Sequence, residues 1–120
     1  MYIQDVEDLF GHARSYFGRD GSCRAYSSGG LWVKLQLHGV HVFYLQMPVG
    51  EMRADTVAFF HQVADGVRNH VFLGVDLSAI PNTQEDVEAA FGVIHRYSRL
   101  MLPDKFLAAF DALTPKELRP

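Results

Sequence analysis

Several features that commonly reveal a protein's compartment are missing from this sequence. It contains one cysteine, Cys23, so it cannot form an intramolecular disulfide. Its N-terminus lacks the basic and apolar regions of a secretory signal. The longest stretch without a charged residue, 35–50, is too short and carries too many glutamine and histidine residues to span a bilayer. These absences predict a cytoplasmic protein that does not enter a membrane.

Positive charge is also in short supply. The chain of 120 residues has 11 lysines and arginines against 14 aspartates and glutamates, a formal net charge of −3. General nucleic-acid binding depends on a surplus of cations that contact phosphates, so we expect no nucleic-acid partner. Hydrophobic residues make up 48% of the chain and charged residues 21%, which is typical of globular proteins. The sequence therefore predicts a single domain over residues 1–120.

Recognisable catalytic and metal-binding motifs are absent as well. No glycine-rich phosphate loop, nucleophile elbow, zinc-protease motif or Cys-x-x-Cys pair occurs. His38 and His41 flank a predicted turn and could approach the same metal ion, but no third ligand lies near them in the sequence. We accordingly expect a protein that is not an enzyme and that holds no metal and no cofactor.

Hydrophobic periodicity indicates a helix followed by three strands. Apolar residues recur at helical spacing over 5–17, and the segments 23–28, 31–37 and 41–47 have the character of strands. Gly39 allows a two-residue turn at either His38-Gly39 or Gly39-Val40. These three strands are predicted to form an antiparallel meander.

The second half of the chain favours helices. Residues 53–70 show helical spacing, and 71–77 fit either a fourth strand or an apolar connection. A helix over 82–101 is capped by Asn82 or Thr83, and a further helix covers 104–113. The predicted order is α-β-β-β-α-(β)-α-α. This is an α+β fold in which helices pack on a three-stranded or four-stranded antiparallel meander.

The central strands suggest a binding surface. Either two-residue turn places Leu31, Val33, Leu35, Leu37, Val42 and Tyr44 on one face of the sheet, which we expect to be the core face. The opposite face then holds large apolar groups among polar ones, a mixture common at protein interfaces. The predicted partner-binding residues are Trp32, Lys34, Gln36, His41, Phe43, Leu45 and Met47. The chain's own helices could instead cover this second face.

Two functions remain open from the sequence. The first is a small protein-binding module of the inhibitor, immunity, adaptor or chaperone type, whose partner is another protein or a second copy of the chain. In element order alone, roughly the first 50 residues resemble the small acidic chaperones of type III secretion, which implies a protein partner and carries over no residue. The alternative is a small enzyme or ligand-binding protein with a site between sheet and helices at His61, Tyr44 and Cys23.

Overall fold

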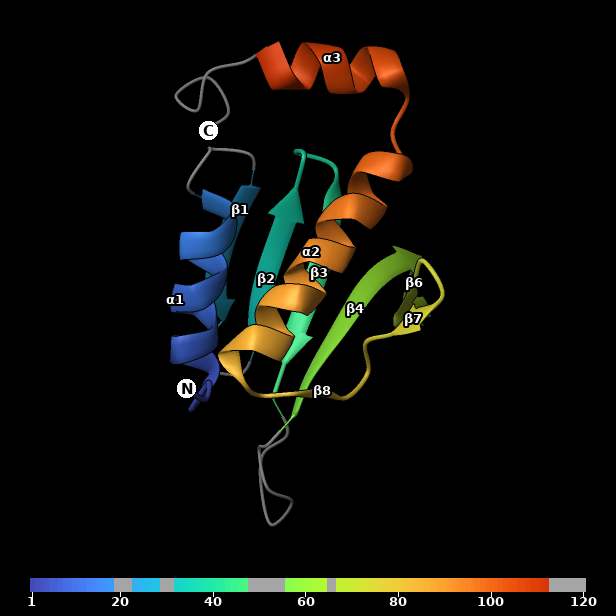
Figure 1. Ribbon diagram of the computed structural model, residues 1–120. Coiled ribbons are helices and arrows are strands. Elements are labelled where there is room, and N and C mark those ends of the chain that lie inside the picture. Colours follow the sequence, from blue (N-terminus) through green and yellow to red (C-terminus); the bar gives the residue numbers. More distant parts are fainter. Residues whose placement is uncertain (19–22, 29–31, 48–55, 65–66, 113–120) are drawn as a thin grey trace.

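The chain combines three helices with eight short strands among the residues that the computed structural model describes. Those residues are 1–18, 23–28, 32–47, 56–64 and 67–112, with 23–28 and 63–64 described by their backbone alone. The elements (Figure 1) are α1 (Val6–Phe17), β1 (Cys23–Ser28), β2 (Trp32–Leu37), β3 (His41–Gln46), β4 (Thr56–Ala64), β5 (Val67–Asn69), β6 (Val71–Phe72), β7 (Val75–Asp76), β8 (Ile80–Pro81), α2 (Gln84–Leu100) and α3 (Asp104–Ala112). The predicted α+β class with an antiparallel meander is confirmed. None of the helices in these ranges has the length and apolar character needed to cross a membrane.

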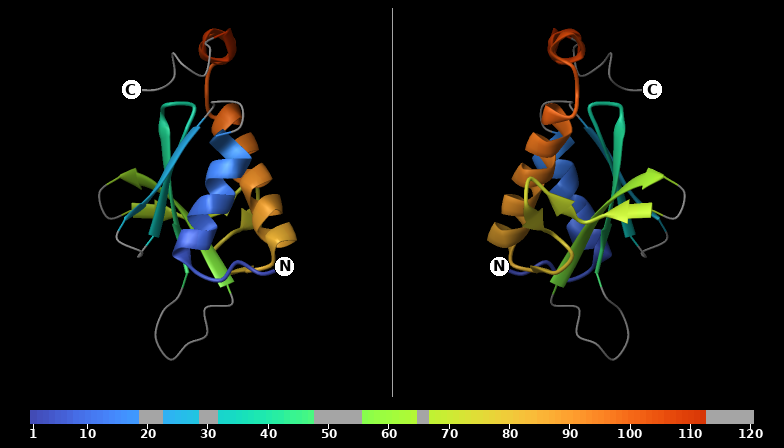
Figure 2. Two further views of the ribbon diagram at one scale, coloured as in Figure 1. Left: turned by 90° about the vertical axis from the view of Figure 1, so that its left-hand side faces the viewer. Right: turned by 90° about the vertical axis from the view of Figure 1, so that its right-hand side faces the viewer.

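The main sheet is antiparallel, and its strands follow the order β1-β2-β3-β4-β5. β8 pairs with the start of β4, where Val57 lies opposite Ile80. α1 and α2 lie on the same side of the sheet (Figure 2), and no helix of the described chain lies over the other side. The helices thus distinguish an inner face, which they cover, from an outer face.

Capping and apolar spacing explain why the two covering helices form where they do. The Asp5 carboxylate accepts a hydrogen bond from the N–H of Asp8 at the start of α1, over 2.8 Å. Of the two caps predicted for α2, the structure uses Thr83, whose hydroxyl accepts from the N–H of Asp86 over 3.2 Å. In the middle of α2, the Phe91 ring is fully buried and meets aromatic rings from α1 and β4.

The helix predicted over 53–70 is wrong, because its described residues form β4 and β5. Val57, Phe59 and His61 are buried, while the residues between them are partly exposed, which is the two-residue period of a strand. Apolar residues of this segment satisfy helical and strand spacing at once. Pairing with β3, which places Leu45 opposite Phe59, satisfies the backbone of β4 as a strand. Tertiary pairing therefore overrides the helical pattern.

The segment 71–77 forms a small hairpin in place of a full strand. β6 and β7 pair through Val71 with Asp76 and through Phe72 with Val75. The turn between them is made by Leu73 and Gly74, with φ values of 52° and 79°. Gly74, which weakens the prediction of a strand, is thus the residue that permits the turn.

The loop between β2 and β3 has three residues, and this overturns the predicted faces of β3. His38 and Gly39 have φ values of 55° and 69°, in agreement with a turn at His38-Gly39. Val40 adds a third loop residue, however, so Leu37 pairs with His41. A shift of one residue moves every side chain of a strand to the opposite face. The face assignment predicted for 41–47 is therefore wrong.

α3 is the least integrated element. None of its residues is buried, and it crosses the end of the molecule beyond the last turn of α2 (Figure 1). The Phe110 ring lies 5.2 Å from the His38 ring, measured between centroids. The Asp111 carboxylate forms a bidentate ion pair with Arg99 of α2, with N–O distances of 2.9 and 3.1 Å. These two contacts link α3 to the loop between β2 and β3 and to α2.

Candidate functional site

The outer face of the sheet presents side chains from four adjacent strands. The strand registers place one set of ten described residues on this face, and none of them is buried. They are Trp32, Lys34, Gln36, Val42, Tyr44, Gln46, Ala58, Phe60, Gln62 and Arg68. Lys34 and Arg68 are the charged members of this described set, so the set is cationic although the chain has a net charge of −3.

Tyr44 is the centre of the aromatic contacts on the outer face. The Trp32 ring meets it edge-on with centroids 6.1 Å apart, and Phe60 lies directly opposite on β4. The Arg68 guanidinium carbon is 5.9 Å from the Tyr44 ring centre and 6.0 Å from that of Phe60. The Lys34 ammonium is 6.0 Å from the Tyr44 ring centre. At these distances a cation is attracted to the electron-rich ring face.

The seven predicted partner-binding residues do not share one face. Trp32, Lys34 and Gln36 lie on the outer face, as partly exposed residues of β2. The other four lie on the inner face, and three of them are almost fully buried: Phe43 and Leu45 at 0% exposure and Met47 at 3%. These three side chains belong to the hydrophobic core on the side of the sheet that the helices cover. The proposed grouping is therefore wrong, and a binding role stays a prediction for the β2 residues.

Sequence reasoning missed Tyr44, Phe60 and Arg68 as members of the outer face. Gln46 was the signal that could have placed Tyr44, because residues two apart on a strand share a face and glutamine favours solvent. Phe60 and Arg68 were hidden by the predicted helix over 53–70. A correct strand assignment for that segment would have brought both to the face that carries Tyr44.

The alternative site at His61, Tyr44 and Cys23 does not come together. Tyr44 pairs with Phe60 on the outer face, while its neighbour Phe43 pairs with His61 on the inner face. The phenol and the imidazole thus lie on opposite sides of the sheet. The side chain of Cys23 lies outside the described part of the structure.

A histidine cluster occupies the inner face near the second half of α2. We use this name for His38, His41, His61 and His95, which come from the β2–β3 loop, β3, β4 and α2. The rings of His38 and His95 are 5.2 Å apart, and those of His41 and His61 are 5.4 Å apart. The sequence scatters these four residues over 58 positions, and the sheet with α2 brings them together.

Two hydroxyl groups of α2 join the histidine cluster to the helix. The Nδ1 atoms of His38 and His41 both lie 2.7 Å from the Ser98 hydroxyl, which is fully buried. The Nδ1 atom of His61 lies 3.3 Å from the Tyr97 hydroxyl. His38 and His41, considered from the sequence as a metal-binding pair, thus direct their Nδ1 atoms to serine. Over the described ranges, no three His, Cys, Asp or Glu side chains are grouped as metal ligands.

Burial lowers the pKa of three members of the histidine cluster, His38, His41 and His61. Burial, followed by the nearby His95, Arg99 and His41, lowers the pKa of His38 from 6.5 to about 4. Burial also lowers the pKa of His41, and burial together with His41 lowers that of His61. The Nε2 atom of His38 is buried without a hydrogen-bond partner. Since His38 is only 1% exposed and Ser98 is fully buried, this serine and histidine are not arranged to meet a substrate.

Comparison with protein-family models, curated proteins and solved structures finds no match to the chain.

Proposed function

We propose that this chain is a small protein-binding module whose interface is the outer face of the sheet. The observation that carries the proposal is the cluster formed by Trp32, Tyr44 and Phe60 with Arg68 on a face that no described helix covers. Tryptophan, tyrosine and arginine are the residues most often found as anchors of protein interfaces. A partner that covers this face would complete the burial of all three aromatic side chains.

The geometry of the face favours a preorganised interface. Side chains on a paired strand are held at fixed spacing, and the T-shaped contact between Trp32 and Tyr44 further limits their motion. Residues that are ordered before binding lose less conformational entropy when the complex forms. An aromatic surface that is ordered in this way suits a folded partner.

The charges on the outer face indicate which chemical groups the partner would present. The two charged residues among the described side chains of the outer face, Lys34 and Arg68, are cations that lie against aromatic rings. A complementary surface would present carboxylates around an apolar centre, because opposite charges at the rim steer association and fix register. Nucleic acid fits less well, because the acidic chain as a whole would repel phosphates.

A capture experiment with paired variants tests the proposal. Wild-type protein and the variants Tyr44→Ser, Arg68→Glu and Lys105→Glu are immobilised and exposed to lysate of the native cell. Lys105 is exposed on α3, away from the sheet, so its variant is the matched control. We expect a protein that is retained by the wild type and by Lys105→Glu and is lost from both outer-face variants. Circular dichroism checks that all variants are folded.

Other results would overturn the interface. Retention of the same proteins by Tyr44→Ser and by the wild type would show that the outer face is not used, and a nuclease-sensitive partner would indicate nucleic-acid binding. The partner could also be a second copy of the chain, and sedimentation then shows a dimer that Tyr44→Ser dissociates. The absence of enzymatic activity and the cytoplasmic location stay predictions in this proposal.

A further inference from the structure

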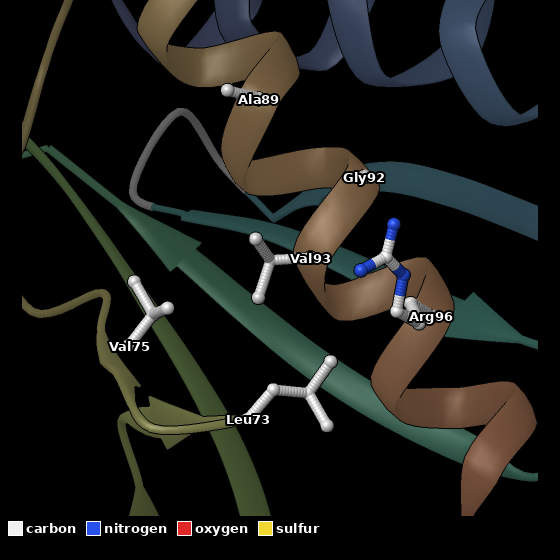
Figure 3. A pocket seen from close by; sticks show the side chains of 6 residues that line it. All are labelled: Leu73, Val75, Ala89, Gly92, Val93 and Arg96. Atoms are coloured by element: carbon white, nitrogen blue, oxygen red, sulfur yellow. The ribbon is translucent and has the colours of Figure 1, made fainter.

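A pocket lies on the helical side of the molecule, away from the outer face. It has a volume of about 290 Å³ and lies between the β6–β7 hairpin and one face of α2. Figure 3 shows Leu73 and Val75 of the hairpin on one side and Val93 of α2 on the other. Ala89, Gly92 and Arg96 complete the lining. Residues spaced three and four apart share a helix face, so the four lining residues of α2 form one continuous wall.

The hairpin side of the pocket is apolar and exposed at an energetic cost. Leu73 and Val75 are 46% and 43% exposed, although the core of the protein lies directly behind the hairpin at Phe72. Leu73 also has a φ of 52°, a conformation that costs a branched residue about 1 kcal/mol. A backbone strained in this way holds the Leu73 side chain on the pocket side.

The helical side of the pocket adds one cation. Arg96 is exposed, and it has neither a hydrogen-bond partner nor an ion-pair partner among the described residues. Its side chain lies along α2 next to Gly92 (Figure 3). By contrast, Arg99 one turn away is held by Asp111. A guanidinium group can donate two parallel hydrogen bonds to a carboxylate, so Arg96 is available for an anion at the pocket.

We propose that this pocket binds a small aliphatic carboxylate. The apolar tail lies between Leu73, Val75 and Val93, where its burial stabilises the complex by the hydrophobic effect. The carboxylate pairs with the Arg96 guanidinium at the end of the apolar walls. The volume is at the lower end of the range of about 300–1,000 Å³ for small-molecule sites, which suits a small ligand. This site is independent of the outer face and of the function proposed for it.

A titration followed by NMR tests the proposal with octanoate as the probe. Octylammonium, which has the same apolar tail and the opposite charge, is titrated in parallel into ¹⁵N-labelled protein at pH 7.4. We expect octanoate to shift the amide resonances of Leu73, Val75, Gly92 and Val93 until saturation. Octylammonium should bind at least about tenfold more weakly, because Arg96 repels it. Equal binding of the two probes would overturn the site, and so would octanoate shifts confined to the outer face.

Two variants measure separately how the charge of Arg96 and the apolar wall at Leu73 contribute to octanoate binding. Arg96→Gln should weaken octanoate binding by about tenfold, while the matched variant Arg68→Gln on the outer face should leave it unchanged. Leu73→Asn removes the apolar wall with a residue that tolerates positive φ, so it should weaken binding without lowering the thermal stability. Unchanged octanoate affinity in both Arg96→Gln and Leu73→Asn would refute the proposal.

Discussion

The two faces of the main sheet contain the same strands and similar side chains, yet they have different surroundings. β3 is apolar on both sides, with Phe43 and Leu45 directed inward and Val42 and Tyr44 directed outward. The inward pair is fully buried, whereas the outward pair is partly exposed. The difference arises from α1 and α2, which cover one face only (Figure 2). Apolar character alone therefore does not identify the core of this sheet. The register of the strands and the position of α1 and α2 determine which side chains of the sheet belong to the core.

This contrast separates stability from binding. Side chains of the inner face contribute to folding, because each is removed from water by the chain itself. Trp32, Tyr44 and Phe60 on the outer face keep part of their apolar area in water, and that area is available to a partner. Substitutions on the two faces should consequently have very different effects on unfolding.

The most severe test places a charge on each face in turn. Phe43→Asp should unfold the protein, because the lost ring costs about 3–5 kcal/mol and the buried carboxylate has no partner. Tyr44→Asp, one residue along the same strand, should cost only about 1–2 kcal/mol. Urea denaturation measures both. A folded Phe43→Asp protein with wild-type stability would contradict the assigned inner face.

A fall in pH should lower the free energy of unfolding through the histidine cluster of the inner face. The folded-state pKa of His38 is about 4, below its ordinary value of 6.5, so the unfolded chain binds more protons between those pH values. The contribution of uncharged His38 to the stability of the fold is therefore fully present above about pH 6.5, and it is lost as the pH falls toward 4. His38 alone accounts for a loss of up to about 3 kcal/mol, and the lowered pKa values of His41 and His61 act in the same direction.

Denaturation curves between pH 7.5 and pH 4.5 measure this acid sensitivity. The variant His38→Asn removes the titrating ring with a residue that accepts the positive φ of the loop. Its stability should depend less on pH over this interval than that of the wild type. The same pH dependence in both proteins would show that His38 does not titrate as inferred.

The smallest effect is expected on the outer face. Arg68→Gln removes the cation above Tyr44 and Phe60 and should lower the free energy of unfolding by about 0.5–1 kcal/mol. Lys105→Gln on α3 is the matched control, since no cation–aromatic contact of Lys105 occurs within the described ranges. If Arg68→Gln lowered the free energy of unfolding by more than Tyr44→Asp does, the outer face would support the fold as strongly as the inner face does.

Local signals were sufficient for much of the fold. The first helix, the three strands that follow it and the helix capped by Thr83 all agree with their sequence patterns. Each of these elements has one dominant period and a recognisable end, such as Asp5 or Thr83 at a helix start. Such features depend on neighbours in the chain, so a single sequence reveals them.

The errors concern strand pairing and register, which the hydrophobic pattern alone does not determine. Residues 56–64 satisfy both helical and strand spacing, and only pairing with β3 selects the strand. The loop at His38 differs from a two-residue turn by one residue, Val40, and this difference exchanges the faces of β3. The outer-face site depends on both facts, because Tyr44 and Phe60 reach it only with this register and this strand.

The Ser98 hydroxyl has a consequence for the tautomers of two histidines. It has a single proton, and the Nδ1 atoms of both His38 and His41 lie 2.7 Å from it. Serine can donate to one ring only, so at least one of these imidazoles must carry its own proton on Nδ1 and donate to the serine oxygen. That ring then has a bare lone pair on Nε2. One hydroxyl proton thus restricts the tautomers of two rings, and Ser98→Ala would release both.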